Sequence, residues 1–240
     1  MENFKEKTNF KKTGTTIAAL KFKDGVLILA DTRSTSGPYV ANKHILKIQE
    51  ITEHIYTAGA GTAADTYRVC KNFGGKLRIF EKKFERKASI EYFKTTVSNH
   101  LHGYGGYISA ALICGGMDED GPKIVSIQPH GSTQDLDYAV NGSGCYAAIG
   151  VLEAFYKKNL SKEEAIEIGI KTIEAGVMND LYSGTGVDYV AIFNENGKVV
   201  VEKKRIELSK ATTNLEFSEK YSKDSVKILK EDVFNLIEEF

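Results

Sequence analysis

The chain has 240 residues, of which 42% are hydrophobic and 27% are charged, a balance typical of a globular protein. Its 32 basic and 32 acidic residues give a formal net charge of zero, so charge does not favour nucleic acid or an anionic membrane as the main partner. The longest apolar runs, such as 26–30, have strand length and fall far short of the roughly 20 residues of a membrane helix. The first fourteen residues lack the apolar segment of a secretory signal. We therefore expect no nucleic acid and no membrane among the partners.

Cysteine and histidine do not form the patterns of a disulfide framework or a metal site. Cys70, Cys114 and Cys145 are widely separated and odd in number, which is typical of structural thiols in a reducing compartment. Among the five histidines, His100 and His102 lie close together, but no second ligand pair accompanies them. We expect three free thiols and no metal ion.

The first half of the chain predicts four strands followed by two helices. In chain order, strands are expected over 15–22, 25–33, 41–51 and 54–61, and helices over 62–84 and 88–104. A hairpin turn at 23–25 joins the first two strands, and Thr62 is suited to cap the first helix. The glycine pair 74–75 marks a possible break in that helix.

The second half repeats this order and adds a final strand pair. Strands are expected over 107–116, 123–129 and 136–142, helices over 145–159 and 161–182, and the last two strands within 187–205. Ser161 and Glu164 have the spacing of a capping box, and Asn196-Gly197 predicts the final turn. Segregated blocks of strands and helices predict an α+β fold with four layers, helix–sheet–sheet–helix, rather than a doubly wound sheet. From about Leu208 the chain is polar and lysine-rich, which fits either a frayed tail or an arm that orders against a partner subunit.

The stretch Thr13-Gly14-Thr15-Thr16 stands between a short charged leader and the first strand. In isolation it is most simply a turn that begins a sheet. A threonine hydroxyl is a poor nucleophile unless a base lies beside it, and a free α-amine with a pKa of about 7.7–8.0 can be that base. Cleavage between Gly14 and Thr15 would give Thr15 such an amine, and the small residue before it would let another group approach the scissile carbonyl.

Two charged residues further along strengthen this hypothesis. Asp31 ends a strongly apolar strand, where an unpaired carboxylate is costly, and Lys47 lies within the half-apolar run 44–51. Each has an ordinary alternative, a turn carboxylate for Asp31 and a solvated strand residue for Lys47. At the ends of neighbouring strands the two could pair, and the ammonium would lower the pKa of a nearby hydroxyl.

Further candidates occur where strands and helices meet. Gly59 and Gly61 allow close backbone approach, and an amide there could stabilise an oxyanion, although a tight turn also explains them. Ser143 precedes one helix, and Asp180 and Ser183, three residues apart, lie in the stretch 179–186 that ends another. Their spacing alone leaves them open as ordinary caps.

Several stretches together resemble a proteasome β-type subunit, and among these the eukaryotic class called β2, which is associated with cleavage after basic residues. The resemblance runs from about Lys12 to Val201, and it is gapless from Thr15 to Asp65. The stretches that carry it are 13–20, 23–35, 56–66, 106–116, 127–133 and 179–188.

The resemblance implies a threonine endopeptidase with the fold of N-terminal nucleophile hydrolases and no cofactor. It divides the chain into a propeptide over 1–14, a catalytic domain over 15–207 and a C-terminal arm over 208–240. The propeptide would be removed autocatalytically at the Gly14–Thr15 bond, and Arg33 would have a structural role. The implied site consists of Thr15 as nucleophile, Asp31 and Lys47 beside it, Ser143, Asp180 and Ser183 around the α-amine, the Gly61 amide as oxyanion donor, and Thr35, Gly59 and Ala63 for substrate binding.

The implied partners are other proteasome α and β subunits, in a hetero-oligomeric core of twenty-eight subunits, together with unfolded or ubiquitin-tagged polypeptide substrates. The implied location is the cytoplasm and nucleus. One alternative is a catalytically silent β subunit that only builds the ring, but such subunits usually lack the nucleophile, the lysine or the Gly-Thr junction. Another is an N-terminal-nucleophile amidohydrolase of small amides, which would not share the stretches 59–65 and 129–133.

The chain departs from the β2 class at two positions that bear on specificity. Gly59, at the floor of the expected pocket, resembles a class with room for a long substrate side chain, and a basic side chain also needs negative charge. Tyr67 stands where an acidic residue is expected, and Ser36 where glutamate is expected. Either a neighbouring subunit supplies the acidic side chain of the pocket, or the preference for cleavage after basic residues has shifted. The end of the arm, 218–240, is also longer than the resemblance predicts.

Overall fold

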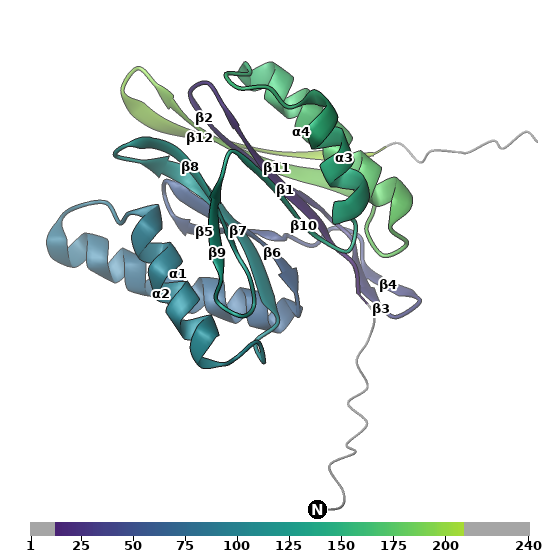
Figure 1. Ribbon diagram of the computed structural model, residues 1–240, viewed down its shortest axis with the longest axis horizontal. Helices are drawn as coiled ribbons and strands as arrows, with labels where there is room; N and C mark the ends of the chain where they lie inside the picture. Colours follow the sequence, from purple (N-terminus) through teal and green to yellow (C-terminus); the bar gives the residue numbers. More distant parts are fainter. Residues whose placement is uncertain (1–12, 209–240) are drawn as a thin grey trace, which may run out of the picture. The chain divides into compact units, whose positions relative to one another are not determined.

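Figure 1 shows the computed structural model, which describes residues 13–208. These residues form twelve strands and four helices, in agreement with the α+β class expected from the sequence. Of the expected propeptide 1–14 and arm 208–240, all but Thr13, Gly14 and Leu208 lie outside the described residues.

Ten of the strands form two antiparallel five-stranded sheets. The first has the order β10 (Tyr138–Gly142), β1 (Thr16–Phe22), β2 (Gly25–Asp31), β11 (Gly186–Glu195) and β12 (Lys198–Glu207). The second has the order β5 (Ile48–Thr52), β6 (Ile55–Gly61), β7 (Ala110–Asp118), β8 (Gly121–Ile127) and β9 (Thr133–Leu136). A separate hairpin consists of β3 (Ser34–Ser36) and β4 (Tyr39–Asn42). Since a single residue, Asp137, separates β9 from β10, the chain passes there directly from one sheet to the other.

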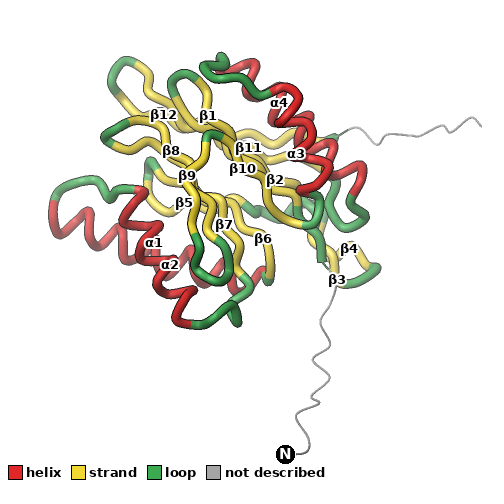
Figure 2. The backbone as a smooth tube through the Cα atoms, in the orientation of Figure 1, coloured by secondary structure: helices red, strands yellow, loops and turns green. Residues whose placement is uncertain are grey.

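Each sheet is covered by a pair of helices, as Figures 1 and 2 show. The first sheet packs against α3 (Cys145–Phe155) and α4 (Lys162–Asn179), and the second against α1 (Ala63–Phe84) and α2 (Ile90–Gly103). A third set of buried side chains joins the two sheets face to face. The predicted capping box of Ser161 and Glu164 at the start of α4 is confirmed.

Strand β2 lies at the centre of this arrangement and is buried along its whole length, which explains its unbroken apolar sequence. Val26 and Ile28 point into the core between the sheets, whereas Leu27 and Leu29 belong to the core under α3 and α4. This alternation is the two-residue period of a strand. Its consequence for the site is that Asp31, the last residue of β2, has no exposed surface.

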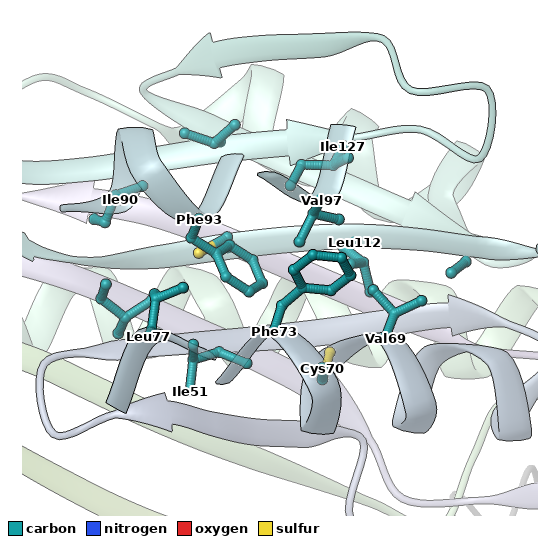
Figure 3. Close-up of a cluster of buried hydrophobic side chains, with 14 of the residues drawn as sticks. Ile51, Val69, Cys70, Phe73, Leu77, Ile90, Phe93, Val97, Leu112 and Ile127 are labelled. Atoms are coloured by element: carbon teal, nitrogen blue, oxygen red, sulfur yellow. The ribbon is translucent and has the colours of Figure 1, made fainter. Parts of the chain in front are cut away.

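The core under α1 and α2 explains why α1 is not interrupted. Figure 3 shows Phe73 and Phe93, from the two helices, among the buried side chains of this core. Helix α1 continues through Gly74 and Gly75, so the predicted break is wrong. A Cβ at Gly74 would lie 3.3 Å from the Ile51 carbonyl oxygen, so glycine allows a close contact between helix and sheet.

The prediction of one strand over 41–51 is also wrong, because β4 ends and β5 begins within it, and 43–47 form a loop. The backbone carbonyl of Thr32 accepts a hydrogen bond from the Ile45 amide, at an N–O distance of 3.0 Å. Lys47 therefore lies at the end of a loop that is tied to the end of β2. The short strand β9 and the β3–β4 hairpin were not predicted.

Candidate active site

Thr15 lies directly before β1, at the end of the first sheet. Its hydroxyl donates a hydrogen bond to the carbonyl oxygen of Gly14, with 2.7 Å between the two oxygens. Gly14 has no room for a side chain, because a Cβ there would overlap Tyr182 and lie 2.9 Å from Oδ2 of Asp180. The small residue thus lets the segment after α4 approach the bond that precedes Thr15.

Asp31 lies beside Thr15 with its carboxylate fully paired. Oδ1 accepts a hydrogen bond of 2.9 Å from the Thr16 amide and one of 2.6 Å from Nζ of Lys47. Oδ2 accepts from the amides of Gly184, at 3.0 Å, and Arg33, at 3.3 Å. Four donors, one of them charged, offset the cost of burying a carboxylate without solvent contact.

Lys47 joins this carboxylate to Thr15. Its Nζ lies 3.1 Å from Oγ1 of Thr15 and 3.2 Å from the Gly14 carbonyl oxygen. The backbone is held as well, because the Gly59 amide on β6 donates to the Lys47 carbonyl at 3.2 Å. The Lys47 side chain is only 9% exposed, and burial lowers its pKa more than the attraction of Asp31 raises it. The ammonium is therefore placed to stabilise negative charge on either oxygen.

A second polar group lies on the other side of Thr15. Oδ2 of Asp180 accepts hydrogen bonds of 2.6 Å from the hydroxyls of both Ser143 and Ser183. Ser143 Oγ in turn accepts from the Thr15 backbone nitrogen at 3.0 Å. Burial on its own would raise the pKa of Asp180, but these hydroxyls and the backbone amides of Tyr182 and Ser183 outweigh it, and the pKa is lowered. The carboxylate is thus held in its ionised form.

Gly14, Thr15 and Lys47 line an open cleft of about 1200 Å³. Gly59, Gly61, Thr35, Ala63 and Tyr67 are among the residues that line it. Thr35 is buried, and its hydroxyl has no hydrogen-bond partner within residues 13–208.

Comparisons with known proteins identify the family. A family model described as "Proteasome subunit" matches residues 11–192. This chain belongs to the proteasome subunit family. Its similarity is to β-type subunits, as three relatives illustrate.

"Probable proteasome subunit beta type-2" of Encephalitozoon cuniculi is 42% identical over 229 residues, which cover 95% of this chain and 99% of the relative. "Proteasome subunit beta type-2" of Saccharomyces cerevisiae is 38% identical over 235 residues, 98% of this chain and 89% of the relative. "Proteasome subunit beta type-7-A" of Arabidopsis thaliana is 45% identical over 188 residues, 78% of this chain and 69% of the relative.

Most of the candidate residues named from the sequence of this proteasome subunit come together in space. One connected set of hydrogen bonds contains Thr15, Asp31, Lys47, Ser143, Asp180 and Ser183. The cleft wall contains Gly61, Gly59, Thr35, Ala63 and Tyr67, whereas Ser36 on β3 is not one of the described residues that line it. Tyr67 is half exposed, and Nζ of Lys71 lies 5.4 Å from the centre of its ring.

Four contacts of the subunit were missed by sequence reasoning. Thr16 donates to Asp31 through its amide and to Ser183 through its hydroxyl. The Gly184 amide is a donor to Asp31, and the Arg33 guanidinium lies over Gly184, where a Cβ would overlap it. The local sequence does not reveal these contacts, since they depend on how β1, β2 and the segment after α4 meet.

The three cysteines all lie within residues 13–208 and are free thiols. Cys70 and Cys114 are buried free thiols whose pKa is raised to about 12 by burial, and Cys145 is a half-buried free thiol. Within residues 13–208, no group of three or more His, Cys, Asp or Glu side chains is arranged to hold a metal ion. Among the helices of the same part of the chain, none is long and apolar enough to cross a membrane.

Proposed function

We propose that this chain is a threonine endopeptidase subunit of a proteasome core, with Thr15 as the nucleophile. One observation carries the proposal: Nζ of the buried Lys47 lies 3.1 Å from the Thr15 hydroxyl and 3.2 Å from the carbonyl oxygen of the preceding Gly14. A cation in a water-poor site that contacts both a hydroxyl and the adjacent carbonyl favours acyl transfer between them. A silent subunit has no need of this arrangement.

The first reaction is removal of the propeptide 1–14. The Thr15 oxygen bonds to the Gly14 carbonyl carbon while the carbon–nitrogen bond between the two residues breaks. The hydroxyl proton reaches the departing nitrogen through a neighbouring base or water, because no free amine exists yet. Water then hydrolyses the ester, which releases Gly14 as a carboxylate and restores the Thr15 hydroxyl beside a new α-amine.

In the mature chain the α-amine takes the hydroxyl proton during attack on a substrate peptide bond. The hydrogen bonds around Ser143 support an orientation for this amine. Both serine protons point to the ionised Asp180, so the lone pair of Ser143 faces the Thr15 nitrogen and accepts one of its protons. The lone pair of the amine remains free to accept the proton of the Thr15 hydroxyl. Lys47 stabilises the charge that develops on the hydroxyl oxygen, and the Gly61 amide would hold the oxyanion. Water completes the cycle by hydrolysing the acyl ester.

The substrate is a polypeptide bound as an extended strand along the cleft, with backbone contacts to the segments of Thr35 and Ala63. The position of Thr35 and Ala63 among the residues that line the cleft supports this part of the proposal. In the particle, the chain would assemble with other α and β subunits, act in the cytoplasm and nucleus, and degrade unfolded or ubiquitin-tagged proteins without a cofactor. The packing of two sheets between two helix pairs supports the four-layer sandwich of N-terminal nucleophile hydrolases.

Cleavage after basic residues, which similarity to the β2 class implies, needs a negative charge in the pocket. None of the described residues that line the cleft is aspartate or glutamate, and Tyr67 stands at the position where acid was expected. We therefore assign the missing acid to a neighbouring subunit of the ring.

The proposal is tested by labelling assembled particles with a peptide electrophile and measuring the mass of this chain. Wild type and the control Thr95→Ala, a change at an exposed position on α2, should each gain one adduct, and Thr15→Ala should gain none. Labelling of Thr15→Ala at the wild-type rate would exclude Thr15 as the nucleophile. An unlabelled wild-type chain would instead identify a silent subunit.

A further inference from the structure

Thr16 is a polar residue that the chemistry described so far does not use. It is the first residue of β1 and has no exposed surface. Its backbone amide donates to Oδ1 of Asp31 at 2.9 Å, and its hydroxyl donates to Oγ of Ser183, also at 2.9 Å. Thr16 therefore contacts the charged pair on one side of Thr15 and the hydroxyl group on the other.

The number of available protons fixes the direction of these hydrogen bonds. Ser143 and Ser183 each have one hydroxyl proton. The shortest hydrogen bond of each hydroxyl, 2.6 Å, is to Oδ2 of Asp180, whereas the Thr15 carbonyl oxygen lies 3.4 Å from Ser143 Oγ, so both protons are assigned to the carboxylate. The Ser183 oxygen can then only accept from further partners, and the Thr16 hydroxyl is the donor that it receives. Donation into Ser183 polarises its own O–H and strengthens the bond to the carboxylate.

The surroundings hold the Thr16 side chain in one position. Gly144, before α3, and Gly176, within α4, face it from two directions. A Cβ at Gly144 would overlap the Thr16 hydroxyl oxygen, and a Cβ at Gly176 would overlap its methyl carbon. Thr16 thus occupies a slot between two helices that only glycines leave open, so its hydroxyl has little freedom to leave Ser183.

We propose that Thr16 is a positioning residue for the reaction, which acts through Ser183 to keep the Asp180 carboxylate turned toward Ser143 and the Thr15 nitrogen. This proposal rests on the proposed function of Thr15. Without the Thr16 donor, Ser183 has an unfilled lone pair in a buried site, and its hydroxyl no longer has a single preferred direction. Asp180 then loses the bond that fixes one side of Oδ2, and the α-amine loses alignment through Ser143.

Two variants separate the hydroxyl from the shape of the side chain. Thr16→Val keeps the volume and removes the hydroxyl, and we expect it to slow the maximal rate of labelling about 3- to 10-fold, the size of one neutral hydrogen bond. The probe concentration for half-maximal rate should not change, because Thr16 does not line the cleft. Thr16→Ser keeps the hydroxyl and should react within about twofold of wild type.

A double-mutant cycle in assembled, processed particles tests whether Thr16 acts through Ser183. If Thr16 acts through Ser183, then Ser183→Ala alone should slow labelling, and adding Thr16→Val to it should cause no further loss. Independent, multiplying losses, or a wild-type rate for Thr16→Val, would overturn the proposal. If Thr16→Val does not enter particles, Thr16→Ser and Thr16→Ala replace it, and equal rates for these two would overturn it as well. A wild-type chain that is never labelled is a different result, because it refutes the proposed function itself.

Discussion

The two sides of Thr15 hold a negative charge in different ways. On one side, Asp31 is fully buried and paired with Lys47, whose side chain is 9% exposed. On the other, Asp180 is half-buried and paired with hydroxyls and amides rather than with a cation. The first side brings a charge to the reacting oxygen, whereas the second directs protons and lone pairs.

The pKa shifts follow the same division. Burial lowers the pKa of Lys47 although Asp31 opposes it, while hydrogen bonds lower the pKa of Asp180 although burial opposes it. An ammonium in a site with little water acts strongly on a developing oxyanion, because solvent does not screen it. Loss of the Lys47 side should therefore cost more activity than loss of the Asp180 side.

The largest effect is expected for Lys47→Ala. The rates of propeptide removal and of peptide cleavage should both fall at least about 10³-fold. The reason is that the variant loses the ammonium group that contacts both the nucleophilic hydroxyl and the scissile carbonyl. The particle should still assemble, because Asp31 keeps its three backbone donors. The matched control is Lys203→Ala, which removes an exposed lysine paired with Glu50 and should leave both rates unchanged. Propeptide removal is measured by intact mass, and peptide cleavage by the rate of peptide hydrolysis. Near-normal rates in Lys47→Ala would contradict the mechanism.

A smaller effect is expected for Asp180→Asn, about 10- to 100-fold in the maximal rate, because the amine loses its alignment rather than its chemistry. The carboxylate favours the ammonium form of the α-amine, so its neutralisation should lower the amine pKa and move the acid limb of the pH–rate profile to lower pH. Asp135→Asn, at an exposed position of β9, is the control. If the acid limb does not move, Asp180 does not influence the pKa of the α-amine.

The lowered pKa of Lys47 predicts a loss of activity on the alkaline side. As the pH rises through this pKa, the ammonium loses its proton earlier than a free lysine, whose pKa is about 10.4, and the stabilising charge disappears. Lys47→Arg should be slower throughout, but its relative profile should stay flat in this range, since arginine keeps its proton. A wild-type rate that rises with pH there would instead indicate a neutral lysine acting as base.

The smallest effect is expected for a change in the cleft, where none of the described lining residues is aspartate or glutamate. Tyr67→Asp should raise cleavage after arginine about 2- to 5-fold and leave cleavage after leucine unchanged, because a half-exposed carboxylate interacts only weakly with a cation. Tyr146→Asp, on the exposed face of α3, is the control for added charge. Equal increases for both substrates would show that the change does not act through charge in the pocket.

Sequence patterns predicted the succession of strands and helices and drew attention to Thr15 and Asp31, because buried strands and capping boxes leave strong local signals. They placed Lys47 within a strand, although it lies at the end of a loop, since the contact between Thr32 and Ile45 that shapes this loop is not local. They gave no reason to single out Thr16, because a buried threonine in a strand is ordinary until its partner Ser183 is known. The partners of Ser143, Asp180 and Ser183 depended on the packing of α3 and α4 against the first sheet.

The central claim is that Thr15 becomes the chain end and reacts from there. The most direct test is the intact mass of this chain in assembled particles, for wild type and for Thr15→Ala. We expect the wild-type chain to lack the fourteen residues Met1–Gly14 and to begin at Thr15, and the variant to retain position 14 and residues before it. A mature wild-type particle whose chain keeps Gly14 joined to Thr15 would contradict the account.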